Sequence, residues 1–420
     1  MFRNFINRIS LHLVFCCFYF IGYAQPNNNI EGKILCGYQG WFNAEGDGSG
    51  LGWKHYTNKG QFNPGLCSID LWPDMSEYTE DEKFPTAFKN ADGSVAEVFS
   101  SAHPKSVDRH FDWMKDYGID GVFIQRFVTN FRRAELHKNL NQVFDNCYNA
   151  SENHNRLISV MYDLSGSKSE LVENTKKDWI QLVDKYGLTD PTKNNVLTYK
   201  AKPVVAIWGV GFNDGRQYTL EQIKELINFF KNDPKYGGCS VLLGVPTGWR
   251  TLSRDCMNNP KVHELIKMAD IVHPWTPGRY KSIEEADEHK RNWTEVDNVW
   301  CEENGLLYMP VVFPGFSWHN LRLGQTPLNQ IPRENGEFLW RQYYNAVSSG
   351  VKTIYVAMFD EMDEGTCIFK CTNNPPVGKS TFATYEELPS DYYLWLTGTA
   401  GKMLRKEISL SKVKPEYPNK

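Results

Sequence analysis

The sequence has no second long apolar run and no excess of positive charge. Beyond the first 24 residues, no stretch approaches the roughly 18 consecutive apolar residues that indicate a membrane-spanning helix. Lysine and arginine number 46 against 50 aspartate and glutamate residues, a formal net charge of -4 at pH 7. Domains that bind nucleic acid usually carry a basic surface. These absences predict that the mature protein is soluble and that its partner is neither nucleic acid nor a membrane.

Motifs for metal ions, dinucleotides and structural repeats are missing as well. The first apolar segment runs into CGYQGW and not into G-x-G-x-x-G. Cys367 and Cys371 are close in sequence, but no second cysteine pair or histidine cluster completes a zinc pattern. They are therefore either a local disulfide or two free thiols. We expect no metal ion and no cofactor.

The first residues resemble an export signal. Arg3 and Arg8 precede the apolar segment LHLVFCCFYFIGYA, which is too short to span a membrane and ends in the small residue Ala24. This pattern predicts a cleaved signal peptide over residues 1–24 and a secreted or periplasmic mature chain, 25–420, that starts at Gln25. Removing the two arginines changes the formal charge from -4 to -6.

Apolar segments and amphipathic helical patterns alternate regularly along the mature chain. Near-continuous apolar strands between helices are typical of parallel strands covered by helices. Eight such units predict an α/β fold, a single (β/α)8 TIM barrel over 25–420, with a long aromatic-rich loop at 43–103 after the first strand. The expected strands are 33–42, 121–128, 157–164, 203–212, 240–245, 271–275, 306–313 and 353–359. The expected helices are 106–117, 132–149, 169–186, 219–231, 261–268, 282–299, 334–349 and 385–396.

The last expected strand ends in a cluster of acids. TIYVAMF is a buried apolar run, and Asp360, Glu361, Asp363 and Glu364 follow it directly. Paired carboxyl groups in different environments can serve as acid and base catalysts. Asp360 and Asp363 need not both point inward, because neighbouring side chains on a strand point to opposite faces. We expect Glu361 and Glu364 in the pocket, and Asp363 less so. The simpler alternative is a solvated turn after a core strand.

Aromatic and polar residues occur at the ends of the other expected strands. In a barrel of this kind the chemistry takes place at the C-terminal ends of the strands. A rim of aromatic rings with polar neighbours suits a carbohydrate, whose apolar ring faces stack on aromatic side chains. The expected substrate-binding residues are Trp41, Gln125, Arg126, Tyr162, Asp163, Trp208, Trp249, Trp275, Trp318, His319, Asp360 and Asp363.

Several motifs together resemble a known family. GYQGWF, WPDMSEY, DYGIDGVFI, VFPGFSW, PRENGEFLWRQYYNAV and FDEMDEGT look like glycoside hydrolase family 99, the endo-α-mannosidases, and more distantly the family 71 α-glucanases. The most specific motif is the family 99 signature N-E-W-H-E-G-T, which this chain has as DEMDEGT. The resemblance implies a bacterial-type secreted protein with a (β/α)8 fold that cleaves an α-linked glycan within the chain, on a mannan-like or related polysaccharide, without a metal ion.

The resemblance also implies roles for two residues. Glu364 matches the family's general acid/base. Glu361 matches the residue thought to deprotonate the sugar 2-hydroxyl, so that the substrate's own oxygen attacks the anomeric carbon. The chain departs from the signature at Asp360, Met362 and Asp363, which replace Asn, Trp and His. An amide becomes an acceptor-only group at Asp360 if that residue is ionised, so the sugar remains open.

Two other classes of function remain. A non-catalytic glycan-binding protein would keep the aromatic cleft and lose turnover, although both catalytic acids are present here. A metal-dependent hydrolase would need histidine and carboxylate ligands around one ion. His273 and His319 are the candidates for that reading, but neither lies in an HxH or HExxH spacing. The oligomeric state, the linkage and endo or exo action are not predicted from the residues themselves.

Overall fold

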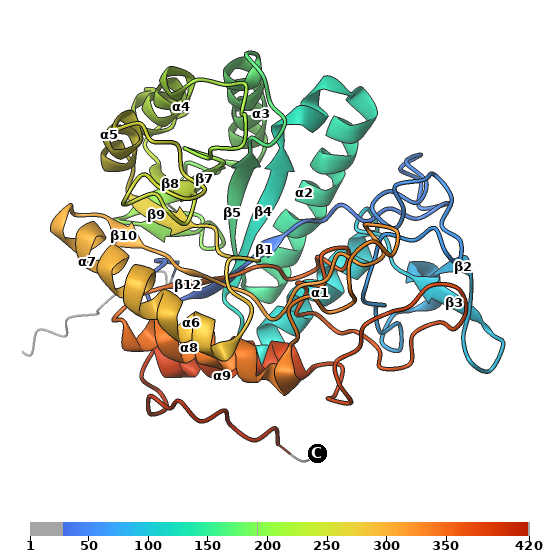
Figure 1. The fold of residues 1–420 in the computed structure, drawn as a ribbon. Coiled ribbons are helices and arrows are strands. Elements are labelled where there is room, and N and C mark those ends of the chain that lie inside the picture. The colour runs from blue at the N-terminus through green and yellow to red at the C-terminus, as the bar shows by residue number, and fades with distance from the viewer. Residues whose placement is uncertain (1–27, 191, 419–420) are drawn as a thin grey trace, which may run out of the picture.

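A barrel of parallel strands occupies the centre of the molecule, and helices cover its outside (Figure 1). The structure is a computed structural model that describes residues 28–190 and 192–418. The predicted signal peptide and the start at Gln25 lie outside the described residues. The strands are β1 (Ile34–Tyr38), β4 (Gly121–Phe127), β5 (Leu157–Asp163), β7 (Lys202–Trp208), β8 (Ser240–Val245), β9 (Ile271–Pro274), β10 (Leu307–Tyr308), β11 (Val311–Val312) and β12 (Ile354–Val356).

The two ends of the sheet meet within a single stretch of chain. The hydrogen-bonded order is β10-β9-β8-β7-β5-β4-β1-β12-β11, and β10 and β11 are separated only by Met309 and Pro310. The Met309 N–H donates to Val272 O at 2.9 Å, and Pro310 O accepts from the Tyr355 N–H at 3.0 Å. Proline has no N–H for a strand ladder, which explains the interruption. All eight predicted strands are present, and the (β/α)8 prediction is confirmed.

The helices between the strands also follow the sequence pattern. They are α1 (Pro104–Tyr117), α2 (Ala134–His154), α3 (Leu171–Tyr186), α4 (Leu220–Asn232), α5 (Lys261–Met268), α6 (Ile283–His289), α7 (Glu295–Glu303), α8 (Glu337–Ser348) and α9 (Tyr392–Leu404). Gly118 ends α1 in the left-handed conformation, with φ of 73°. Thr219 caps α4 by accepting from the Gln222 N–H. Within the described residues, no helix is long and apolar enough to cross a membrane.

Two helix predictions were wrong in detail. The expected helix 282–299 is α6 and α7 with a π-helical turn, Lys290–Thr294, between them. The expected closing helix 385–396 begins only at Tyr392. Glu386 and Glu387 have φ of 56° and 68°, which a right-handed helix does not contain, and Pro389 lacks the N–H of a helix interior.

The loop after β1 is ordered by its aromatic residues. It contains an antiparallel hairpin, β2 (Phe84–Lys89) and β3 (Val95–Val98), which the sequence pattern did not predict. Phe62 and Trp72 stack with ring centroids 5.7 Å apart, and both are buried. The Val377 N–H donates to Lys89 O at 2.9 Å, so the hairpin lies beside the loop that follows β12 (Figure 1).

The pleat of the strands divides the core into two parts. Leu35, Phe123, Met161, Leu242 and Tyr355 pack against one another inside the barrel. Their strand neighbours pack between the sheet and the helices: Cys36, Val122, Ile124, Val160, Val241, Leu243, Ile354 and Val356. Because side chains alternate along a strand, the same division extends to the residues at the strand ends.

Candidate active site

A cavity of about 500 Å³ opens at the C-terminal ends of the barrel strands. Its walls come from the ends of several strands and from the loops that follow them. The lining residues are Gln39, Trp41, Gln125, Phe127, Asp163, Ser165, Trp208, Trp275, Pro277, Gly278, Arg279, Phe316, Trp318, Gln330, Met358, Glu361 and Glu364. The cavity therefore contains both predicted catalytic acids and six of the predicted substrate-binding residues.

Glu361 is held firmly in the wall of the cavity. Its side chain is 4% exposed, and each carboxyl oxygen accepts one hydrogen bond. Gln39 Nε2 donates to Oε1 at 2.7 Å, and Thr366 Oγ1 donates to Oε2 at 2.7 Å. Gln39 lies at the end of β1, next to β12 in the sheet. The two donors fix the orientation of the carboxyl group that faces the cavity.

Glu364 reaches the same cavity from the other side of a tight turn. The Ser317 N–H donates to Glu364 O at 2.8 Å, and the Gly365 N–H donates to Met362 O. Gly365 has φ of 63°, and a Cβ there would lie 2.9 Å from Ser317 Cβ. Only glycine fits this close approach. The turn thus brings residues 361 and 364 to one cavity while Met362 is buried in the core.

The environment favours a proton on this pair of acids. Burial raises the pKa of Glu361 well above its ordinary value, and the charges of Glu364 and Asp363 raise it further. Burial raises the pKa of Glu364 to about 7, with Asp363 contributing in the same direction. Hydrogen bonds from Thr366 and Gln39 favour the ionised form of Glu361. Near neutral pH the pair can therefore hold one proton, as a general acid next to a general base requires.

The other two acids of the turn do not line the cavity. Asp360 is fully buried and accepts the N–H groups of Gln39 and Gly40, each at 2.8 Å. Burial raises its pKa to about 7, and these two donors oppose the shift. Asp360 thus fastens the turn at 360–365, which carries both predicted catalytic acids and is called the catalytic turn below, to the end of β1. Asp360 itself does not line the cavity.

Asp363 contacts the cavity wall only through a second residue. Its carboxyl group lies 3.3 Å from His55 Nδ1, and the His55 ring stacks on Trp41 with centroids 3.9 Å apart. Burial raises the pKa of Asp363 to about 7 and lowers that of His55 to about 3. Trp41 lines the cavity, so Asp363 is two contacts away from any bound ligand.

Several buried polar atoms of the residues that line the cavity have no hydrogen-bond partner in the part of the chain that the structure describes. Gln39 Oε1 and the Nε1 atoms of Trp41 and Trp208 are buried and have no hydrogen-bond partner among the described residues. Buried polar groups nearly always have partners, so such atoms in the wall of a cavity indicate a ligand or water that supplies them. Asp163 adds a carboxyl group whose pKa is raised by burial and whose Oδ1 accepts the Ser165 N–H at 2.7 Å.

Arg126 and Tyr162 were predicted at the site but lie on the outer face of the sheet. Arg126 is fully buried, and its Nε donates to Asp178 Oδ2 in α3 at 2.7 Å. The Tyr162 hydroxyl donates to the same oxygen at 2.9 Å. Each is adjacent in sequence to a residue that lines the cavity, Gln125 and Asp163. The strand pleat sends neighbours to opposite faces, which corrects both assignments.

Trp249 and His319 are also turned away from the cavity. Trp249 is fully buried, with its ring centroid 5.0 Å from that of Trp300 in α7. His319 Nδ1 donates to Thr326 O at 2.7 Å, within its own loop. Loop residues after a strand do not follow the pleat, so the sequence pattern could not orient them.

The two histidines considered as metal ligands have separate surroundings. His273 is buried with its ring 4.4 Å from that of Tyr355, and burial lowers its pKa to about 3. His319 contacts Thr326, as described above. In the part of the chain that the structure describes, no three His, Cys, Asp or Glu side chains are grouped closely enough to hold a metal ion.

Sequence reasoning missed about half of the cavity wall. The missed residues are Gln39, Phe127, Ser165, Pro277, Gly278, Arg279, Phe316, Gln330 and Met358. Phe127 could have been found, because it lies two positions after the predicted residue Gln125 on the same face of β4. The others come from loops whose paths the sequence does not specify.

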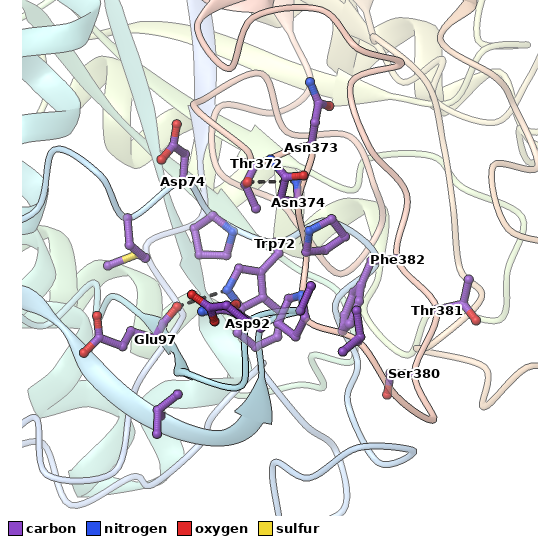
Figure 2. A pocket seen from close by; sticks show the side chains of 18 residues that line it. Trp72, Asp74, Asp92, Glu97, Thr372, Asn373, Asn374, Ser380, Thr381 and Phe382 are labelled. Atoms are coloured by element: carbon purple, nitrogen blue, oxygen red, sulfur yellow. Dashed lines mark hydrogen bonds between the residues drawn. The ribbon is translucent and has the colours of Figure 1, made fainter.

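A larger groove, of about 800 Å³, lies elsewhere on the molecule. It is formed by the β2–β3 hairpin and the loop at 372–382, around Trp72 and Phe382 (Figure 2). It shares no lining residue with the cavity and includes none of the residues predicted for the site. Its Asp92 is fully exposed and bonded to Ser94, which lowers the pKa of the carboxyl group. The cavity, and not the groove, therefore has the environment that acid catalysis needs.

Comparisons with known proteins find similarity to glycoside hydrolases. Residues 284–406, which include the catalytic turn, match the model of glycosyl hydrolase family 99. A solved GH99 endo-alpha-mannosidase from Bacteroides thetaiotaomicron is 15% identical, with a TM-score of 0.63, covering 90% of this chain and 99% of that chain. Its complex with bis-tris-propane gives a TM-score of 0.62 at 14% identity, with 90% and 98% covered.

A third solved structure, a glycoside hydrolase-like protein, gives a TM-score of 0.52 at 14% identity, covering 77% of this chain and 91% of that chain. A search of curated proteins gives no match. The solved structures share the fold. Together with the family-model match over the catalytic turn, the findings support a glycosidase.

Proposed function

We propose that this glycosidase hydrolyses an α-linked glycan with Glu364 as general acid/base and Glu361 as the base that activates the substrate's own 2-hydroxyl. The observation that carries the proposal is the pair itself: two carboxyl groups from one turn line one cavity, and burial together with the charge of Asp363 raises the pKa of both. Paired carboxyl groups with shifted pKa values are the usual machinery of glycoside hydrolysis.

Glu364 is the acid of the pair. A pKa of about 7 keeps it protonated in mildly acidic and neutral solution, so it can protonate the departing glycosidic oxygen. After that step it is an ionised carboxylate and can accept a proton from the incoming water. It is only half-buried, whereas Glu361 is 4% exposed, which fits the residue that meets both the leaving group and the water.

Glu361 is the base of the pair. Both of its oxygens accept hydrogen bonds from Gln39 and Thr366, which favours the carboxylate and fixes its direction. A fixed carboxylate can accept the proton of a sugar 2-hydroxyl while that oxygen forms a bond with the anomeric carbon. Water, which gives a proton to Glu364, then attacks the anomeric carbon and opens the three-membered ring formed by the 2-oxygen, while Glu361 returns its proton to that oxygen. This second inversion retains the anomeric configuration overall.

The substrate is an oligosaccharide or polysaccharide bound along the cavity. Four tryptophans, Trp41, Trp208, Trp275 and Trp318, line the cavity, and indole N–H groups and the Gln39 carbonyl have hydrogen-bonding capacity to spare. Sugars present apolar ring faces and hydroxyls that match both features. By likeness to the endo-α-mannosidases, we propose endo action on a mannan-like or related polysaccharide.

The three residues that depart from the family signature should have only a limited effect on substrate binding. Asp360 binds the end of β1, Met362 is in the core, and Asp363 contacts His55. None of them lines the cavity. Their influence on the bound sugar is therefore indirect, through the position of the turn and of Trp41.

Product analysis on a panel of defined α-linked oligosaccharides tests the proposal. We expect new internal cleavage products whose configuration, followed by NMR, is retained. A 2-deoxy analogue should bind but resist cleavage, and no sugar should become attached to Glu361. Efficient cleavage of that analogue, or a glycosyl adduct on Glu361, would return the enzyme to ordinary double displacement. An inverted product would exclude both schemes.

The alternative of a glycan-binding protein makes a different prediction for the same panel. Such a protein would bind oligosaccharides tightly and release no products. The raised pKa values of Glu361 and Glu364 favour the enzyme, because binding alone does not require a shared proton. Undiminished binding with no turnover at any pH would favour the binding protein.

We also propose that the chain is exported and that its mature form begins at Gln25. The support is the apolar segment that ends at Ala24. The intact mass of material recovered from the medium or periplasm decides it, and retention of residues 1–24 would reject export by this signal.

A further inference from the structure

Cys367 and Cys371 meet directly behind the catalytic turn. Their sulfur atoms lie 3.7 Å apart, and both side chains are completely buried. The structure holds them as thiols, and among the described cysteines no other pair of sulfurs is in contact. A disulfide needs the sulfurs about 2.05 Å apart, which small rotations of two side chains can provide.

The backbone around this pair is fixed on several sides. The Cys367 N–H donates to Glu361 O at 3.2 Å, and Cys367 O accepts from Arg333 Nη2 at 2.7 Å. Tyr385 Oη donates to Phe369 O at 2.6 Å. The contact between the sulfurs is therefore imposed by the tertiary structure and does not depend on a mobile loop.

The segment around Trp72 and Pro73 holds Cys371 in the same way. Cys371 forms an antiparallel bridge with Pro73, and the Thr372 N–H donates to Trp72 O at 3.0 Å. The segment 367–371 thus connects the turn that carries Glu361 and Glu364 with the wall of the groove around Trp72. A covalent bond here would close a small ring at the base of the catalytic turn.

We propose that Cys367 and Cys371 form a disulfide when the chain folds in an oxidising compartment. The two thiols lose two protons and two electrons to a disulfide of a protein oxidant or of glutathione, which is reduced to two thiols. Because both sulfurs are buried in the folded chain, the exchange takes place during folding. The bond stabilises the catalytic turn and does not take part in glycan cleavage.

Trypsin provides a direct test, because Lys370 lies between the two cysteines. Chain recovered from an oxidising compartment is denatured, alkylated without reductant and digested. We expect peptides 353–370 and 371–379 as one linked species that separates on reduction, with the remaining cysteines alkylated. Two separate alkylated peptides, or a bond from either cysteine to a third one, would overturn the proposal.

Thermal unfolding gives a second readout that does not depend on activity. Reduction should lower the Tm of the wild type by roughly 2–4 °C, the order expected for a small closed ring in a large domain. Cys367→Ser and Cys371→Ser should remove this response to reductant. The control variant Cys256→Ala replaces a buried free cysteine and should keep the response. A Tm response that survives in Cys367→Ser would also count against the bond.

Discussion

At the C-terminal ends of the barrel strands, the inner and outer faces of the sheet have different roles. Gln125 and Asp163 point inward and line the cavity, whereas their neighbours Arg126 and Tyr162 point outward and bind Asp178 of α3. Both faces carry buried polar groups. On the outer face Arg126 and Tyr162 both donate to Asp178, whereas in the cavity wall Gln39 Oε1 and Trp208 Nε1 have no partner among the described residues. Burial with complete pairing indicates stability, and burial with incomplete pairing indicates a binding site.

The same contrast exists within the catalytic turn. Asp360 accepts two backbone N–H groups and joins the turn to β1, while Glu361, the next residue, lines the cavity. Burial raises the pKa of both, so a shifted pKa alone does not separate a structural acid from a catalytic one. The separation comes from access to the cavity.

The largest effect is expected from the two inner acids. Glu361→Gln and Glu364→Gln should each lower kcat by roughly 10² to 10⁴, the contribution of general acid or base catalysis. Glutamine keeps the shape of both side chains. At position 361 its amide oxygen can accept from Gln39 Nε2 and its amide nitrogen can donate to Thr366 Oγ1, so folding and glycan binding should be preserved. Glu97→Gln in the groove is the matched control and should keep full turnover. Rates above about a tenth of wild type in both cavity variants would contradict the assignment.

The outer face should respond in stability and not in turnover. Arg126→Met leaves Asp178 buried without its cation and should lower the free energy of unfolding by about 3–5 kcal/mol. The substitution Gln125→Met, at the inward-facing neighbour of Arg126, should lower the free energy of unfolding by only about 1 kcal/mol. Its main effect should be a higher KM. Urea unfolding and steady-state kinetics measure both. Equal losses of stability in the two variants would remove the distinction between the faces.

Gln39 tests whether a positioning residue on β1 acts through Glu361. Gln39→Met removes the 2.7 Å hydrogen bond to Oε1 and should lower kcat about tenfold. The lost donor should also raise the pKa of Glu361, because hydrogen bonds from Gln39 favour its ionised form. The acidic limb of kcat should therefore move to higher pH. A lower kcat with an unchanged pH profile would indicate a merely structural role.

The alkaline limb of the pH profile should report Glu364. Activity needs its protonated form, so kcat/KM should fall as the pH rises through about 7. The Asp363 charge helps to hold that proton, and Asp363→Asn should therefore move the alkaline limb to lower pH. Asparagine can keep the contact with His55. A limb that stays in place, measured over the full pH range, would show that Asp363 does not act on Glu364.

The smallest effect is expected from a single indole N–H. Trp208→Phe keeps an aromatic ring in the cavity wall and removes an unpartnered donor, so KM should rise roughly three- to tenfold at unchanged kcat. Trp249→Phe is the outer-face control, since Trp249 packs against α7, and its KM should not change. A similar KM in both variants would mean that the Trp208 N–H does not reach the substrate.

The sequence by itself determined the barrel and the position of its acids in the chain. Apolar strands alternate with amphipathic helices, and this periodicity follows from which residues each element must bury. The strand 353–359 and the acids after it could be predicted from neighbours in the chain. The pairing of Glu361 with Glu364 depends instead on the turn that Ser317 and Gly365 hold. Helix ends at Gly118 and Thr219 were equally local, because each cap depends on a single side chain or its absence.

Only the tertiary structure decided which polar residues meet. The hydrogen bond from Gln39 to Glu361 joins residues 322 positions apart in the sequence. The hydrogen bond from Arg126 to Asp178 connects the sheet to a helix. The face on which a strand-end residue lies depends on the exact register and on where the strand stops. β12 ends at Val356, three residues before its apolar run does. A one-residue change in such an end reverses the direction of every later side chain, and composition and spacing do not carry that information.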